Sequence, residues 1–281
     1  MNPEVNNWLQ LIFRWGHVIA GVMWIGHLWF FNFVNGPFAA KMDGPTKKVV
    51  VPELMPRALF WFRWGAAWTW ITGFLLLGLI YYQTKSVLFD MDAPTHGGFW
   101  FFGSENAVVA VRGGFNPWLW LAIVLIMLAI GFVIYNLILK KVKNVTGASA
   151  INLVLFVIVY GVLECLGHFS GRALYIHAGG IFGTMMALNV WMVIWPYQQK
   201  IIRGIKDGNP ADAETVRQAG LRSRQNTYMS VPLIFLMISN HYPTIYGADC
   251  WVRDGVLAGV IIAGFLLVRW MYSKAATVQG F

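Results

Sequence analysis

Residues 172–200, RALYIHAGGIFGTMMALNVWMVIWPYQQK, decide the fold class of this 281-residue chain. No charged residue lies between Arg172 and Lys200, and the stretch between them is long enough to cross a bilayer as one helix. Small residues recur along it at Gly179, Gly180, Gly183 and Ala187. Such a stripe allows another helix or a flat ligand to approach the backbone closely. Since lipid offers an imidazole no partner, we expect His177 to face the interior of a helix bundle.

The composition predicts an all-α integral membrane protein with a single transmembrane domain, residues 1–281. Hydrophobic residues make up 58% of the chain and charged residues only 12%. Fifteen Trp and ten Tyr suit the aromatic belts of a membrane protein. The net charge of +9 does not indicate a nucleic-acid partner, because the Lys and Arg residues lie in alternate loops. The polar N-terminus gives no sign of a cleavable signal peptide, and neither CxxC nor CxxCH occurs.

Apolar segments predict a bundle of about seven transmembrane helices. They lie at residues 8–34, 58–83, 117–139, 148–168, 172–196, 226–243 and 252–272. Of the 21 Lys and Arg residues, fifteen lie in or within about one helical turn of the odd-numbered loops and the C-terminal tail, and four lie in or at the edges of the even-numbered loops. The positive-inside rule therefore predicts that the N-terminus lies outside and the C-terminus inside.

Two of the predicted loops carry features of their own. In the loop at 197–225, Asn209 is expected to cap a separate surface helix with Pro210 at its first position. The loop at 84–116, which contains His96, is either a lid or a docking surface.

The histidines of the predicted spans gather at one depth. With the N-terminus outside, His17 lies in the outer half of the first span, and His168 ends the fourth. His177 lies near the start of the fifth span, and His241 lies at the end of the sixth. Four histidines from four helices would thus meet near the outer face. His27 lies towards the inner end, where we expect a hydrogen-bonded core residue.

A b-type haem explains this cluster economically, because neutral imidazole is an axial ligand and a helix bundle can hold the macrocycle edge-on. Gly179 and Gly183 would make room for the ring. Arg14, Arg172 and Arg63 are candidate partners of its propionates. Two alternatives stay open, namely another metal and purely structural histidines. No carboxylate or thiolate stands at ligand spacing among the histidines, however.

Three further residues lie near the predicted outer face. Cys165 and Cys250 are placed where a disulfide is permitted, but their spacing does not decide whether they pair. Glu164 is either a carboxylate on a proton path or an interfacial residue, and we expect the interfacial role.

Several segments resemble the membrane domain of the bacterial membrane-bound urate oxidases (urate hydroxylases). The segments are RWGHVIAGVMWIG at 14–26, LFWFRWGAAWTWITGF at 59–74, HAGGIFGTMMALNVWMVIWPYQQK at 177–200 and RSRQNTYMSVPLIFLMISNHYP at 222–243. The resemblance implies an oxidoreductase of the bacterial inner membrane that hydroxylates urate. It also implies that the electrons pass to a c-type cytochrome on the outer face rather than directly to oxygen.

The resemblance can be carried over to single residues. His17, His177 and His241 match the histidines of the family, whereas His27 does not. For an anionic purine such as urate, or another small aromatic substrate, Arg172, Arg14 and Asn240 are the candidate donors to its oxygens.

The sequence also departs from that family, in which the membrane domain is followed by a further span and a c-type cytochrome domain. Neither follows here before Phe281, so we expect a separate electron acceptor or a changed substrate. The competing interpretation is an accessory subunit of a respiratory supercomplex, either haem-containing or structural. The RxxH…W element beginning at Arg14 is also similar to the haem-binding membrane protoporphyrinogen oxidases. A transporter lacks support, since no internal repeat is visible.

Overall fold

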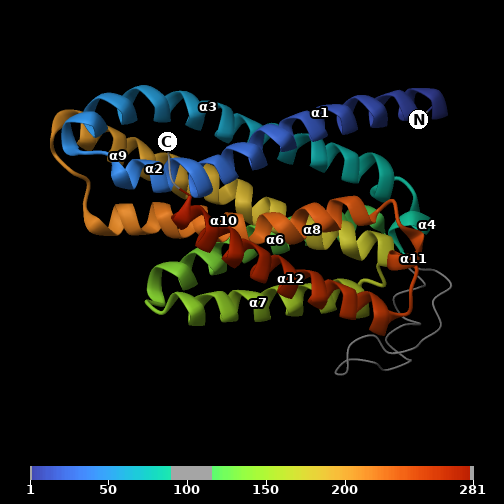
Figure 1. Ribbon diagram of the computed structural model, residues 1–281. Coiled ribbons are helices and arrows are strands. Elements are labelled where there is room, and N and C mark those ends of the chain that lie inside the picture. The colour runs from blue at the N-terminus through green and yellow to red at the C-terminus, as the bar shows by residue number, and fades with distance from the viewer. Residues whose placement is uncertain (1, 90–115, 279–281) are drawn as a thin grey trace. The chain divides into compact units, whose positions relative to one another are not determined.

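The chain folds into long helices joined by short turns (Figure 1). The computed structural model describes residues 2–89 and 116–278. Within these ranges the regular elements are helical, apart from an isolated bridge between Phe89 and Phe169. The predicted all-α class is therefore confirmed for the described residues. Most of the predicted loop at 84–116, including His96, lies outside them.

The elements follow one another in chain order. The N-terminal part contains α1 (Pro3–Trp29), the π-helical turn η1 (Phe30–Asn35), α2 (Gly36–Lys41), α3 (Gly44–Leu77), the π-helical turn η2 (Gly78–Tyr82) and α4 (Lys85–Leu88). The middle part contains α6 (Pro117–Lys141), α7 (Val145–Gly161), η3 (Val162–Leu166), α8 (Gly171–Asn189), η4 (Val190–Ile194) and α9 (Trp195–Asp207). The C-terminal part contains α10 (Ala213–Ser239), α11 (Pro243–Tyr246) and α12 (Cys250–Thr277). Each π-helical turn continues the α-helix before it without a break.

Six helical segments of the described chain are long and apolar enough to cross a membrane, judged by length and composition. They are Pro3–Lys41, Gly44–Tyr82, Trp118–Lys141, Val145–Cys165, Gly171–Asp207 and Cys250–Thr277. The predicted span at 226–243 is not among them. It forms the second part of α10, which ends at Ser239 and begins with a charged first part. Seven spans and an outer N-terminus therefore remain predictions.

The predicted loop between the first two spans is mostly helical, because α2 extends to Lys41 and α3 begins at Gly44. The chain leaves the helical conformation between Lys41 and Gly44, at Met42 and Asp43. A side-chain oxygen of Asp43 accepts a hydrogen bond from the backbone N–H of Thr46 at 2.9 Å, which satisfies a donor at the start of α3. The polar residues that suggested a loop lie on helix termini, and hydropathy alone does not show how far a helix extends beyond its apolar part.

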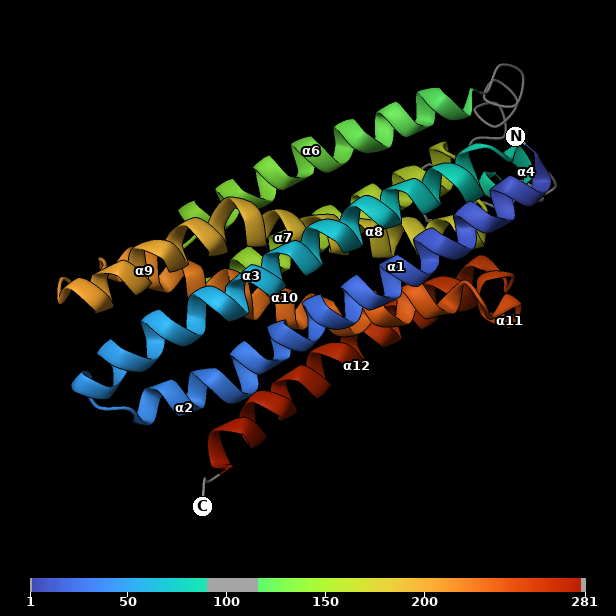
Figure 2. The same cartoon turned by 90° about the horizontal axis from the view of Figure 1, so that it is seen from above.

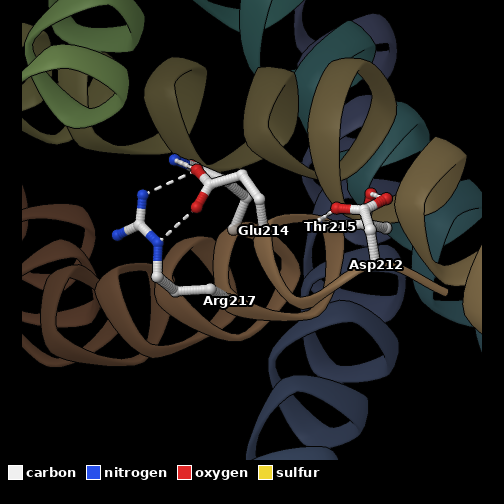
Figure 3. A network of polar contacts seen from close by, with 5 residues as sticks. Asp212, Glu214, Thr215 and Arg217 are labelled. Atoms are coloured by element: carbon white, nitrogen blue, oxygen red, sulfur yellow. Dashed lines mark hydrogen bonds and ion pairs between the residues drawn. The ribbon is translucent and has the colours of Figure 1, made fainter.

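The helix expected to begin after Asn209 begins instead at Ala213 (Figure 3). Asp212 caps it, accepting hydrogen bonds from the backbone N–H of Thr215 at 2.8 Å and from its hydroxyl at 2.7 Å. The preceding helix, α9, ends at Asp207. The next residue, Gly208, has a φ of 74°, which is the left-handed conformation that glycine adopts easily. The predicted surface helix is also not separate, because α10 continues through Pro232 to Ser239.

Glu214 lies in the first turn of α10, two residues after the capping Asp212, and allows the stability of this helix start to be tested (Figure 3). It accepts hydrogen bonds from Nε and Nη2 of Arg217, both at 2.7 Å, and from Gln218 at 2.9 Å. These hydrogen bonds lower the pKa of Glu214 from 4.5 to about 2. Because the folded-state pKa lies below the unfolded value, its stabilising effect is present above pH 4.5 and is lost as the pH falls towards 2.

We therefore expect the protection factors for amide hydrogen exchange in the first turn of α10, corrected for the intrinsic exchange rate at each pH, to fall as the pH is lowered from 4.5 towards 2. The variant Glu214→Gln should show a weaker dependence on pH. Asp212 is present in both proteins, so their difference isolates Glu214. Hydrogen exchange read by mass spectrometry checks this prediction, and an equal pH dependence in the two proteins would contradict it.

The chain divides into two compact units. The first comprises Met1–Phe74, Phe182–Pro232 and Gly259–Phe281, and the second comprises Leu75–Ile181 and Leu233–Ala258. Within the first unit, α1 and the first part of α3 lie side by side (Figures 1 and 2). A Cβ atom at Gly65 would lie 3.1 Å from the backbone nitrogen of Trp24 and 3.2 Å from the oxygen of Ala20. Glycine at this position therefore lets the two backbones approach.

Polar side chains join helices inside the first unit. Asn189 of α8 donates to Asn226 of α10 at 2.8 Å, and both side chains are fully buried. Trp29 donates to Ser230 at 3.0 Å, which links α1 to α10. Apolar side chains such as Trp15 face outwards instead, as lipid contact requires.

Candidate functional site

Two adjacent tyrosines at the end of η2 organise the polar interior of the second unit. Tyr81 is 3% exposed and Tyr82 is 1% exposed. The hydroxyl of Tyr82 lies 2.8 Å from Nε2 of His177 in α8. The hydroxyl of Tyr81 donates to the side-chain oxygen of Asn240, which directly follows α10. One helical turn thus connects two of the residues that the sequence singled out.

The hydrogen bonds of His177 define its tautomer. Nδ1 lies 2.7 Å from the carbonyl oxygen of Ala173, one turn earlier in α8. Because a carbonyl only accepts, Nδ1 carries the proton, and Nε2 of the neutral ring accepts from Tyr82. The ring is 2% exposed, and its centroid lies 4.8 Å from that of Phe169. His177 therefore faces the protein interior, as predicted.

Arg172 and Asn240, the predicted substrate-binding residues, both contact Tyr81. The guanidinium carbon of Arg172 lies 5.7 Å from the centre of the Tyr81 ring and 6.0 Å from that of Tyr246. Nε of Arg172 is buried and makes no hydrogen bond within the described residues. The amide of Asn240 donates to the backbone oxygen of Leu236 at 3.4 Å. This group combines a cation, an amide and aromatic faces, which suits a planar anion.

His17 lies in the first unit, on α1. Its Nδ1 is 3.2 Å from the hydroxyl oxygen of Thr72, and that hydroxyl donates to the carbonyl oxygen of Trp68 at 2.6 Å. His17 is therefore the donor, and its Nε2 carries the lone pair. A Cβ atom at Gly73 would lie 3.0 Å from Cε1 of His17. Glycine at 73 thus makes room for the imidazole.

His27 repeats the arrangement of His177. Its Nδ1 lies 2.7 Å from the carbonyl oxygen of Met23, so the prediction of a hydrogen-bonded histidine is confirmed. His17, His27 and His177 hence share one arrangement, in which Nδ1–H donates a hydrogen bond and Nε2 points away from that partner. Metal-binding histidines are oriented in the same way, by a hydrogen bond from the nitrogen that does not bind the metal.

The structure also places three other predicted cofactor residues, each within its own unit. His241 is exposed in the turn after α10, where its backbone N–H donates to the oxygen of Ile238 at 3.1 Å. His168 is half-buried before α8 and has a positive φ of 48°. Arg14 is exposed on α1. His17 belongs to the first unit, whereas His168 and His241 belong to the second. The predicted convergence of four histidines therefore remains a prediction.

The glycine stripe of α8 serves helix packing at Gly179. A Cβ atom there would lie 2.8 Å from the terminal methyl of Met237 and 3.2 Å from Cβ of Leu236, both on α10. Side chains of α10 thus occupy the space that the sequence analysis offered to a haem ring at this position. Gly183 is half-buried in the part of α8 that belongs to the first unit.

Charged residues near the predicted outer face are also placed. Glu164 is 9% exposed and forms an ion pair with Arg253 of α12, so it is buried within the protein, and its interfacial role stays a prediction. Cys165 and Cys250 are separate half-buried thiols, and the disulfide left open by their spacing is not formed. Among the described residues, no group of three or more His, Cys, Asp or Glu side chains is placed to hold a metal ion.

Tyr81 and Tyr82 are the site residues that the sequence analysis missed. Composition alone assigned the tyrosines to interfacial belts, and these two end a predicted span. The sequence signal that could have found them is that the two tyrosines stand side by side at the end of the predicted span at 58–83, while another predicted span carries His177.

The family described as Urate oxidase N-terminal matches residues 39–280. The matched region contains Arg172, His177 and Asn240, whereas His17 and Arg14 precede it. Comparison with curated proteins and with solved structures gave no match. The family match covers far more than half of the chain and confirms the suspected family; it includes the quoted segments at 59–74, 177–200 and 222–243, whereas the segment at 14–26 precedes it. This chain therefore belongs to the urate oxidase N-terminal family.

Proposed function

We propose that this chain is a multi-pass oxidoreductase of the bacterial inner membrane that binds b-type haem and hydroxylates urate or a related small aromatic anion. Its electrons would pass to a c-type cytochrome on the outer face. The observation that carries the proposal is the η2 turn. Tyr81 holds Asn240 and underlies Arg172, and the neighbouring Tyr82 bonds His177. A substrate site and a potential haem ligand thus share one helical turn.

The donor chemistry of His17 and His177 suits axial haem ligation. Each has an unprotonated Nε2, and each Nδ1–H is held by a hydrogen bond, to Thr72 and to Ala173 respectively. Ligation by His177 would require its hydrogen bond with Tyr82 to open. When bound, haem would supply a centre that accepts electrons one at a time. His241 is not included, because its side chain is exposed.

The residues around Arg172 match the chemistry of urate, a planar anion with several carbonyl oxygens. The guanidinium group would pair with the anion, and its buried Nε has a hydrogen bond to donate. Tyr81 and Tyr246 offer ring faces, and Asn240 offers an amide. In the proposed reaction the oxygen of water is added to urate, and two electrons and two protons are released. The cytochrome is the oxidant.

The proposal is tested on the purified chain in detergent. A reduced-minus-oxidised optical spectrum with pyridine haemochrome quantification measures the haem. Reduction of an added c-type cytochrome on mixing with urate measures turnover. Haem together with urate-dependent reduction supports the proposal. Haem without turnover would favour an accessory electron-transfer subunit, and a well-folded preparation without haem would reject the redox role.

Replacing Arg172 with Gln should raise the KM for urate about 10- to 100-fold, since a hydrogen bond to a charged group contributes roughly 1.5–3 kcal/mol. The reason is that the glutamine amide keeps a donor but loses the positive charge. Steady-state kinetics with added cytochrome measures the effect. Arg217→Gln is the matched control, because Arg217 lies exposed on α10 and pairs with Glu214. An unchanged KM in Arg172→Gln would reject the substrate role.

A further inference from the structure

A buried group of charged side chains in the second unit contains more carboxylates than cations. Arg253 of α12 forms an ion pair with Glu164 of η3, and its Nε lies 3.7 Å from Oδ1 of the neighbouring Asp254. The Glu164 side chain is 7% exposed and that of Arg253 is 12% exposed. One guanidinium group therefore faces two carboxyl groups.

Among the described residues, the groups that contact this cluster add no second cation. Tyr160 of α7 donates its hydroxyl to Oδ1 of Asp254 at 3.0 Å. Tyr175 of α8 donates to the backbone oxygen of Arg253 at 2.5 Å. Cys165 and Cys250 are free thiols, and Cys165 directly follows Glu164 in the chain. None of these four side chains can supply a positive charge.

The charge count has an energetic consequence. If both carboxyls were ionised, the cluster would carry one net negative charge that is largely buried in the protein, which is unfavourable. One oxygen of Glu164, Oε2, is buried and makes no hydrogen bond within the described residues. An ionised carboxylate with an unsatisfied oxygen is costly, whereas one bound proton makes the whole cluster neutral. Two like charges held close together favour such sharing.

We propose that Glu164 and Asp254 together bind one proton at neutral pH, so that these two carboxyls and Arg253 form a neutral proton-storage site. The side chain of Asp254 is 26% exposed, which gives the stored proton a path of exchange with the surroundings. Glu164 is the buried end of the site. The proposal requires neither haem nor urate, and it goes beyond the proposed function.

Infrared difference spectroscopy tests this proposal by comparing the unmodified protein with its variants. A carboxylic acid has a C=O stretching band that a carboxylate lacks. We expect the spectrum of the unmodified protein at neutral pH to contain a band from about one shared acid group per chain, and to shift in D2O. In Glu164→Gln the band should disappear, because Asp254 then pairs with Arg253 one to one. In Asp254→Asn it should disappear for the corresponding reason. Glu214→Gln, which alters an exposed carboxylate, should leave it unchanged.

Two outcomes would overturn the proposal. If neither variant differs from the unmodified protein in this band, both carboxyls are ionised. If only one variant loses the band, the proton belongs to an ordinary buried acid and is not shared. Glutamine keeps an oxygen that accepts from Arg253, which favours folding. Should a variant nevertheless fail to fold, Tyr160→Phe provides the second test. Loss of its hydrogen bond should shift the band, and an unshifted spectrum would count against the site.

Discussion

Replacing His177 with alanine is expected to abolish the b-type haem absorbance of the purified protein and to lower urate-dependent cytochrome reduction at least about 100-fold. Losing the hydrogen-bond partner of a metal-binding histidine already costs about 10- to 100-fold in metal affinity or activity, and losing the ligand should cost no less. The expectation rests on Nε2, which is unprotonated because Nδ1 donates to Ala173. Pyridine haemochrome quantification per chain provides the measurement.

Two variants make this test specific. Tyr82→Phe removes the hydroxyl that competes for Nε2 of His177, so haem content should be retained. His241→Ala changes an exposed histidine and should also retain haem. A His177→Ala protein that folds and keeps its full haem content would exclude His177 as a ligand. Loss of haem in His241→Ala would instead identify His241 as a haem ligand, as the sequence predicts.

Replacing Gly171 with alanine should destabilise the protein by about 1–3 kcal/mol or more, the usual cost of forcing extra atoms into a packed interior. A Cβ atom at this position would collide with the backbone oxygen of Tyr246 in α11 and lie 3.2 Å from Cδ of Arg253. The backbone of Tyr246 cannot rotate away from the added atom, as a flexible side chain could. Because Arg172 follows directly, the KM for urate should rise as well.

The matched control is Gly180→Ala on the same helix. No described atom lies within 4 Å of its Cβ position. Alanine forms helices better than glycine by about 1 kcal/mol, so this variant should be as stable as the original or slightly more stable. Thermal unfolding in detergent compares the two, and equal melting temperatures for both variants would show that α11 yields without cost.

The long apolar helices could be predicted from the sequence because their boundaries carry strong signals. The predicted span at 117–139 corresponds to α6, which begins at Pro117 and ends with Lys140 and Lys141. A run of apolar residues that must satisfy its own backbone in lipid can only be a helix. Where residues such as proline and lysine mark the two ends of an apolar run, hydropathy is therefore sufficient to predict the helix.

Helix α10 shows where this reasoning fails. Its first part contains charged and polar residues, so hydropathy separated it from the apolar part and suggested a surface helix. In the structure these polar residues lie on a buried face that includes Gln218, Arg222 and Asn226. They recur every three or four residues, which is the period of one helix face. A count of apolar residues cannot detect a face that is buried by polar contacts.

The site was predicted in part for a similar reason. Arg172, His177 and Asn240 stood out because polar residues in apolar spans require partners. The partners themselves, Tyr81 and Tyr82, lie in a π-helical turn. A pattern read with 3.6 residues per turn cannot place side chains that follow such a turn, so the contacts that join the site were not predictable from spacing.

The π-helical turn η2 makes the register of the site depend on a single residue. A π-helical turn holds one residue more than the α-helical turn it replaces. Removing one residue from Gly78–Tyr82 would leave a regular helix but would rotate everything beyond it by about 100°. The two hydroxyls would then leave His177 and Asn240 while the membrane-crossing length stayed nearly constant. A one-residue gap at η2 would therefore mark family members that retain the scaffold but have lost this arrangement.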